Sequence, residues 1–179
     1  MSPQTIPSIV EMIHRHGRLF RVSKQLAVER AANAAAEFGG AADAVDAAAA
    51  DVFGVNRTDL RILATAMDGP LTAGQVAVAV HLSPAAATTA IQRLVARGYL
   101  TRESDPQDRR RAVVALTASA RELAERIYGP VGETGMAVLR RWSAAELELI
   151  ADFLERGRAM QLAQADRIRE LAPHPGGQE

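Results

Sequence analysis

Residues 71–120 decide the fold, and they read LTAGQVAVAVHLSPAAATTAIQRLVARGYLTRESDPQDRRRAVVALTASA. Thr72 can cap a short helix that runs through Val80. The alternation in VAVAV would also suit a strand, but the residues that follow it favour the helix. His81 stands in a tight link where the backbone often needs a positive φ, which His tolerates at a cost of about 1 kcal/mol. This part of the stretch therefore predicts a short helix followed by a tight turn.

The second helix of the stretch has clear signals at both ends. Ser83 is a good N-cap, and Pro84 stands at the first helical position, where its missing N–H costs nothing. Gly98 is expected to end this helix, which we place at Pro84–Arg97 with apolar residues on one side. A short helix, a tight turn and an amphipathic second helix predict a helix-turn-helix.

After Gly98 the apolar residues recur with the period of a strand. The runs YLTRES (99–104) and RAVVAL (111–116) flank DPQDRR (105–110), a charged turn that contains proline. A charged hairpin directly behind the second helix is a wing. The sequence therefore predicts a mainly α protein with a small β-hairpin wing, that is, a winged helix-turn-helix domain.

Helical segments are also expected before this domain. Residues 6–38 carry apolar side chains at spacings of three and four. The glycine pair at 39–40 is expected to end or bend this helix, and an Ala-rich second stretch follows over 41–53. Asn56 or Thr58 can then cap a further helix.

The last third of the chain is expected to be helical again. Thr117 can cap its first helix, and the Gly-Pro pair at 129–130 is expected to kink or break it. Ser143 and Glu146 have the spacing of a capping box, and the helix that they start would run to Leu171, roughly 42 Å at 1.5 Å per residue. One domain cannot easily cover such a helix, so the first and last thirds of the chain are predicted to be dimerisation helices.

These boundaries predict four parts. They are an N-terminal helical dimerisation segment (1–54), the winged helix-turn-helix DNA-binding domain (55–117), C-terminal dimerisation helices (118–172) and a disordered tail (173–179).

The composition supports helix and excludes several classes of protein. Of 179 residues 36 are Ala, the strongest helix former, and none is Cys, which excludes disulfide scaffolds, thiolate metal sites and thiol-based sensing. No apolar stretch approaches the ~18 to 20 residues that cross a bilayer, and no secretory signal is recognisable, so a cytoplasmic protein without membrane contact is expected. A Gly-rich phosphate loop, HExxH and GxSxG are absent from the sequence, which argues against an enzyme.

Charge is balanced over the whole chain but not along it. The chain has 21 basic and 21 acidic residues, yet residues 92–111 carry six arginines against three acidic residues. A basic patch on a neutral protein indicates where a polyanion would bind. Glu11 and His14 share a helix face, but the chain offers no further set of ligands at metal spacing, so neither a metal nor another cofactor is expected.

The quoted stretch resembles the winged helix-turn-helix core of the MarR (multiple antibiotic resistance regulator) family of bacterial transcription factors. The resemblance rests on LSPxxxT, RLVARGYL and DPxDRR and is strongest over about 60–120. It implies that the second helix is a recognition helix that enters the major groove of double-stranded DNA. The positions that it assigns to base and phosphate contacts are Ser83, Pro84, Ala85, Ala86, Thr88, Thr89, Gln92 and Arg93.

The resemblance also assigns roles to the wing. It implies that Arg110 enters the minor groove and that Asp108 pairs with its guanidinium. Arg109 and Arg111 are placed to face phosphates, and Arg102 on the first strand is a further candidate. Because the alanines of the second helix offer only apolar contact, we expect groove shape and the wing to supply much of the specificity.

The family implies a homodimer on a pseudo-palindromic operator, most often a repressor released by a small aromatic or phenolic effector. The resemblance places the effector in a crevice near helices 6–38 and 58–67, without identifying ligand-binding residues. The alternative is a helical protein-interaction module that has kept a winged domain without operator binding. The arginine-rich wing favours DNA, because a protein-binding module would be expected to carry an apolar patch instead.

Overall fold

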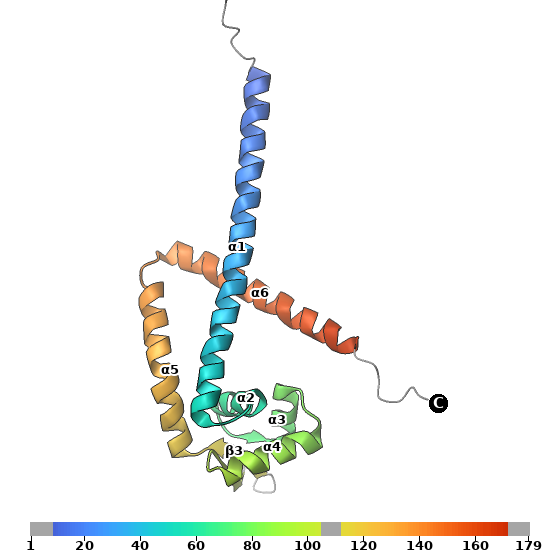
Figure 1. Cartoon of the computed structure of the whole chain (residues 1–179), viewed down its shortest axis with the longest axis vertical. Helices are drawn as coiled ribbons and strands as arrows, with labels where there is room; N and C mark the ends of the chain where they lie inside the picture. The colour runs from blue at the N-terminus through green and yellow to red at the C-terminus, as the bar shows by residue number, and fades with distance from the viewer. Residues whose placement is uncertain (1–8, 105–111, 172–179) are drawn as a thin grey trace, which may run out of the picture. The chain divides into compact units, whose positions relative to one another are not determined.

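A computed structural model of the chain describes residues 9–104 and 112–171, with side chains from residue 23 onward. The chain forms two compact units, residues 1–121 and 122–179. The elements of the described residues are the helices α1 (Ile9–Phe53), α2 (Arg57–Ala66), α3 (Ala73–Val80), α4 (Pro84–Ala96), α5 (Ala118–Leu139) and α6 (Ala144–Glu170) and the strands β1 (Leu71–Thr72), β2 (Leu100–Ser104) and β3 (Ala112–Leu116) (Figure 1). The predicted fold class is confirmed: the chain is mainly helical with a small antiparallel wing.

The wing is a three-stranded sheet rather than a simple hairpin. Its strand order is β1-β3-β2, and both pairs are antiparallel. The register places Leu100 opposite Leu116 and Arg102 opposite Val114, while Leu71 of β1 pairs with Val114 from the other side. The sequence did not predict β1, because a strand of two residues is too short to show an alternating pattern.

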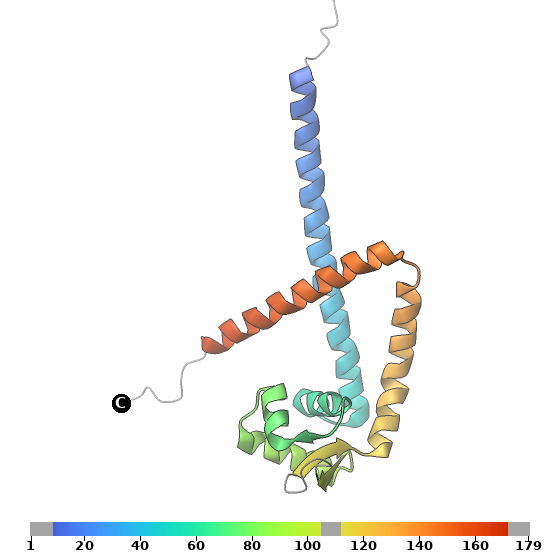
Figure 2. The ribbon, with the colours of Figure 1, turned by 180° about the vertical axis from the view of Figure 1, so that it is seen from behind.

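The core of the first unit lies between α2, α3, α4 and the sheet, which gather at the C-terminal end of α1 in both ribbon views (Figures 1 and 2). Each element contributes apolar side chains to it, and burying a large one stabilises the fold by about 1.5–3 kcal/mol. The largest fully buried apolar side chains are those of Ile62, Val76, Ile91, Leu94 and Leu100.

The predicted helix caps are confirmed in the part of the chain from α2 to β3 (residues 57–116), which we call the winged unit. Thr72 forms a capping box with Gln75, in which the Thr72 hydroxyl accepts a hydrogen bond from the Gln75 backbone N–H and the Gln75 side chain accepts one from the Thr72 backbone N–H. Ser83 Oγ accepts the backbone N–H of Ala86 at 3.2 Å, and Asn56, not Thr58, caps α2. These caps fix where each helix begins.

The glycine pair at 39–40 does not end the helix, so that part of the prediction is wrong. α1 runs as one helix from Ile9 to Phe53, through both glycines (Figure 1). Each glycine costs about 1 kcal/mol relative to alanine inside a helix, but the surrounding residues are mainly alanine, which favours helix most. The helix ends at Gly54, where φ is +63° and the N–H groups of Gly54 and Val55 bond back to carbonyls of the last turn.

Nor does the Gly-Pro pair at 129–130 break its helix. α5 continues through Pro130 to Leu139, although Pro130 has no N–H to donate to the preceding turn. Thr117 caps this helix as predicted, since its hydroxyl accepts the backbone N–H of Ala120 at 3.2 Å. Flanking helical turns can therefore carry the helix past one missing hydrogen bond.

The predicted capping box of the last helix is confirmed. The Ser143 hydroxyl accepts the backbone N–H of Glu146, and the Glu146 carboxylate accepts hydrogen bonds from the hydroxyl and the backbone N–H of Ser143. These bonds lower the pKa of Glu146, the hydroxyl having the larger effect.

Among the described residues, no helix has the length and apolar content that crossing a membrane requires.

His81 adopts the left-handed conformation that its place in the turn predicts, with φ 57° and ψ 47°. Its backbone N–H bonds to Val78 and that of Leu82 bonds to Ala77, which closes α3. Because glycine adopts this conformation without a steric cost, His81→Gly is expected to raise the free energy of unfolding by about 0.5–1 kcal/mol in urea denaturation.

Gly98→Ala is the matched opposite change, because Gly98 has φ +74° and a Cβ there would meet no atom within 4 Å. Its expected effect is a loss of about 1 kcal/mol that comes from the backbone alone. If His81→Gly lowered stability as well, the His81 side chain rather than its backbone would be what stabilises the turn.

Candidate nucleic-acid interface

α4, which the sequence predicts to be the recognition helix, lies against α3 with small and apolar side chains. Ala87, Ala90, Ile91 and Leu94 are buried, and the turn at His81 joins the two helices. The Pro84 ring stands at the first position of α4, directly after the Ser83 cap. The N-terminal end of α4 is thus held in a defined place with its opposite side open to solvent.

The predicted contact residues of α4 lie on that open side. Because residues four and seven apart share one helix face, Ala85, Thr89 and Gln92 form its exposed line. Ser83, Pro84, Ala86 and Thr88 are also exposed around the N-terminal turns. Arg93 is exposed as well, so all eight predicted positions of this helix are accessible to solvent.

The two threonines bond to their own helix. Thr88 Oγ1 donates to the Pro84 carbonyl at 2.9 Å, and Thr89 Oγ1 donates to the Ala85 carbonyl at 3.1 Å. This back-bonding occupies the single proton of each hydroxyl. What remains for a ligand is the methyl group and the lone pairs of the oxygen.

Arg93 forms an ion pair with Asp59 of α2. Its Nε donates to Asp59 Oδ2 at 2.8 Å and its Nη2 to Asp59 Oδ1 at 2.6 Å. The Asp59 side chain is 1% exposed, whereas that of Arg93 is 42% exposed. The hydrogen bonds to Asp59, and secondly its charge, raise the pKa of Arg93. Arg93 therefore anchors α4 to α2 through two of its guanidinium nitrogens.

Asp59 was not predicted from the sequence as part of the site. It stands in the first turn of α2, where an acidic residue is commonly exposed and interacts with the helix dipole. Here its backbone N–H donates to Asn56 Oδ1 at 2.8 Å, and its carboxylate accepts from Asn56 Nδ2 at 3.2 Å. Its spacing of three and four residues from the apolar Ile62 and Leu63, which are buried, indicates the core-facing side of the helix. The sequence does not indicate its partner, which lies 34 residues away.

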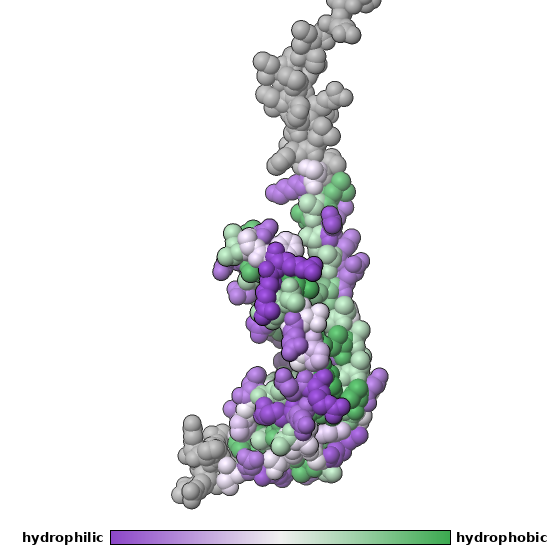
Figure 3. Space-filling model, turned by 90° about the vertical axis from the view of Figure 1, so that its left-hand side faces the viewer, coloured by the Kyte–Doolittle hydropathy of each residue, from purple (hydrophilic) through white to green (hydrophobic). Residues whose placement is uncertain are grey.

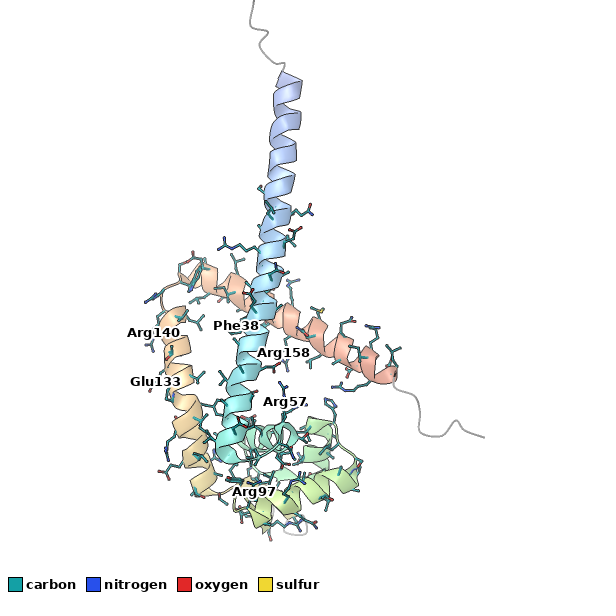
Figure 4. All side chains as sticks on the ribbon, viewed as in Figure 1. Phe38, Arg57, Arg97, Glu133, Arg140 and Arg158 are labelled. Atoms are coloured by element: carbon teal, nitrogen blue, oxygen red, sulfur yellow. The ribbon has the colours of Figure 1, made fainter. Side chains whose placement is uncertain are left out.

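Tyr99 connects the exit of α4 to α1. Its hydroxyl donates to the Phe53 carbonyl at 2.6 Å, its ring packs edge-on against the Phe53 ring, and the Arg97 guanidinium lies 5.9 Å from the ring centre. Figure 4 labels Arg97 at the end of α4 and Arg57 at the start of α2, where Arg57 pairs with Asp43 of α1. Polar contacts with Asp43 and with the Phe53 carbonyl thus connect the winged unit to the C-terminal part of α1.

The wing lies beside the recognition helix. Arg102 is exposed on β2 and lines a cavity of about 190 Å³ together with Thr88 and Ile91 of α4, Ala73 of α3 and residues of β3. Asp108, Arg109, Arg110 and Arg111, the predicted contacts at the wing tip, lie outside the described residues. Arg102 is therefore the one of the five predicted wing residues that lies in the described part of the wing, and it lies next to α4.

Comparison with known proteins gives one family. The sequence model of the MarR family matches residues 53–111. An HTH-type transcriptional regulator of Bacillus subtilis, the uncharacterized protein YcgE, is 36% identical over 127 residues, which cover 69% of this chain and 80% of that protein.

Two solved structures are similar in fold. A mutant of MepR from a multidrug-resistant S. aureus clinical isolate has a TM-score of 0.52 at 19% identity, covering 82% of this chain and 96% of its own. The transcriptional regulator SlyA has a TM-score of 0.51 at 19% identity, covering 74% of this chain and 96% of its own.

A recognition helix that is seated on a short helix, exposed on its other side and flanked by an antiparallel wing defines a winged helix-turn-helix protein. The chain belongs to the MarR family. It is a DNA-binding transcriptional regulator and not an enzyme.

Proposed function

We propose that two copies of this chain form a homodimer that binds a pseudo-palindromic operator and represses transcription until a small-molecule effector releases it. Members of the family bind DNA operators, typically as dimers. The observation that carries the DNA-binding part is the exposed face of α4, held in place by the Ser83 cap and the Arg93–Asp59 pair. Two-fold symmetry would place the half-site centres about 34–36 Å apart.

The homodimer is supported by apolar side chains that a single chain leaves open to solvent. α6 has 27 residues, none of them buried, although Leu149, Phe153 and Leu154 are among them. α1 likewise exposes Phe38 at 70%, and apolar residues reach the surface in the space-filling view (Figure 3). Because helices of this length owe most of their stability to packing of an apolar face, a second copy of the chain is the partner that we propose.

The proposed contacts are those that the sequence predicts. α4 would contribute Ser83, Pro84, Ala85, Ala86, Thr88, Thr89, Gln92 and Arg93, and the wing would contribute Arg102, Asp108, Arg109, Arg110 and Arg111. An effector in the cavity lined by Thr88 and Arg102 would touch both α4 and the wing. This cavity is a second candidate effector site, in addition to the crevice that the resemblance implies. Regulation of transcription supports a cytoplasmic location.

Arg110→Ala is expected to weaken binding to the operator by about tenfold, because an arginine in the narrow minor groove interacts with concentrated negative potential. Fluorescence anisotropy against a labelled duplex from the upstream region of the gene and a scrambled duplex measures this loss at several salt concentrations. Folding should be unchanged, since the sequence predicts that Arg110 lies in the charged turn between the two strands of the wing.

Arg61→Ala is the matched control, an exposed arginine of α2 outside the helix and the wing that the proposal assigns to DNA. Tight binding to the upstream duplex that is insensitive to Arg110→Ala would contradict the role of the wing. Equal, weak binding to both duplexes would contradict operator binding in this region and favour the protein-interaction module.

A further inference from the structure

The exposed face of α4 offers DNA few hydrogen-bond donors. Ala85 and Ala86 carry methyl groups, and Arg93 directs Nε and Nη2 to Asp59. Gln92 is the residue of this face whose amide can pair with a base edge. The first two turns of the helix therefore present mainly methyl groups to whatever lies in front of them.

The threonine hydroxyls add to this apolar character. Thr89, at the centre of the exposed line, donates its proton to the Ala85 carbonyl, and Thr88 donates to the Pro84 carbonyl. Neither hydroxyl can donate to a phosphate, to a purine N7 or to guanine O6 without giving up that bond. The Thr89 methyl thus extends the apolar surface that Ala85 and Ala86 begin.

In the major groove one base carries an apolar group. Thymine presents its 5-methyl group there, whereas guanine, adenine and cytosine present donors and acceptors. We propose that the recognition helix reads thymine through this methyl group, with Ala85, Ala86 and Thr89 forming the surface that contacts it. This inference rests on the proposed binding of α4 in the major groove. Gln92, which can pair with adenine, then makes A·T pairs the preferred content of the half-site.

The experiment begins with duplexes that the full-length protein selects from a randomised library. Each thymine of the selected half-site is then replaced by uracil, which keeps the base pair and removes the methyl group. One or two replacements per half-site are expected to weaken binding about fourfold each, the effect of one buried methyl group. Thymines outside the half-sites are the control and are expected to have no effect.

Two variants of Thr89 separate the methyl group from the hydroxyl. Thr89→Val keeps a β-branched methyl surface, and Thr89→Ser keeps the hydroxyl. The readout is the ratio of the dissociation constants for the uracil and the thymine duplex, which a general loss of binding does not change. Thr89→Val is expected to keep the roughly fourfold ratio, and Thr89→Ser is expected to bring it close to one at the thymine that Thr89 contacts.

The possible results separate three claims: reading of the thymine methyl group, the role of the Thr89 methyl group, and sequence-specific binding itself. If uracil is tolerated at every position of a selected half-site, methyl reading is wrong while operator binding stands. If uracil weakens binding but Thr89→Val abolishes the ratio and Thr89→Ser keeps it, the hydroxyl reads the base and the assignment to the Thr89 methyl is overturned. If the library yields no enriched sequence, sequence-specific binding itself fails, and this inference fails with it.

Discussion

Replacing Arg93 by alanine is expected to lower the free energy of unfolding of the winged unit by about 3 kcal/mol. The Asp59 carboxylate is 1% exposed and would lose both hydrogen bonds to Arg93, at 2.6 and 2.8 Å. Asn56 and the N-terminal end of α2 would still interact with it, which keeps the loss at the lower end for a broken buried pair. Urea denaturation followed by circular dichroism, at a fixed protein concentration, measures the change.

The chain contains its own control for this prediction. Arg57 of α2 and Asp43 of α1 are also an arginine and an aspartate that pair, but their side chains are 67% and 66% exposed. Arg57→Ala is therefore expected to change stability by at most about 0.5 kcal/mol. Equal losses for Arg93→Ala and Arg57→Ala would contradict a stabilising role of the buried pair.

The same variants test the second role that the sequence assigns to Arg93. Asp59→Asn and Arg93→Ala both weaken the contact between α4 and α2, and both are expected to weaken operator binding. Because Arg93 is also one of the proposed DNA contacts, the salt slope is expected to fall by about one in Arg93→Ala and to stay unchanged in Asp59→Asn. An unchanged slope in both variants would leave Arg93 a positioning role alone. Hydrogen exchange of peptides from α4 would report the loosening of the helix directly.

Local signals predicted most of the winged unit. Thr72, Ser83 and Gly98 act within one helical turn of themselves, so their effect on helix ends can be read without knowing the fold. The same holds for Ser143 and Glu146 at the start of α6. His81 is a further case, because the tight turn between two closely spaced helices requires a positive φ at this residue.

The errors arose where local signals compete with their surroundings. The glycine pair at 39–40 and Pro130 are helix breakers taken alone, but each lies within many residues that favour helix, and the helices continue. Contacts across long stretches of sequence could not be predicted either. The Asp59–Arg93 pair and the pairing of Tyr99 with the Phe53 carbonyl become visible once α2, α4 and the end of α1 are in place.

Leu94→Ala is expected to lower the free energy of unfolding by about 3 kcal/mol, within the usual range of about 2–5 kcal/mol for such changes. The Leu94 side chain is 0% exposed on the buried side of α4, where Ile91 and Leu100 are also fully buried. The loss combines the transfer of the side chain with the cavity that it leaves. Urea denaturation by circular dichroism measures this loss in the same way as for Arg93.

Val78→Ala on α3 is the control for this prediction, because Val78 is 77% exposed and its loss leaves no cavity. It is expected to change stability by at most about 0.5 kcal/mol. Leu94 also accepts, through its carbonyl, the backbone N–H of Tyr99 at 3.0 Å, so it lies where the helix passes into the wing. Leu94→Ala should therefore weaken operator binding while Val78→Ala does not. If the two variants lost equal stability, packing on the buried side of α4 would not be what holds the recognition helix in place.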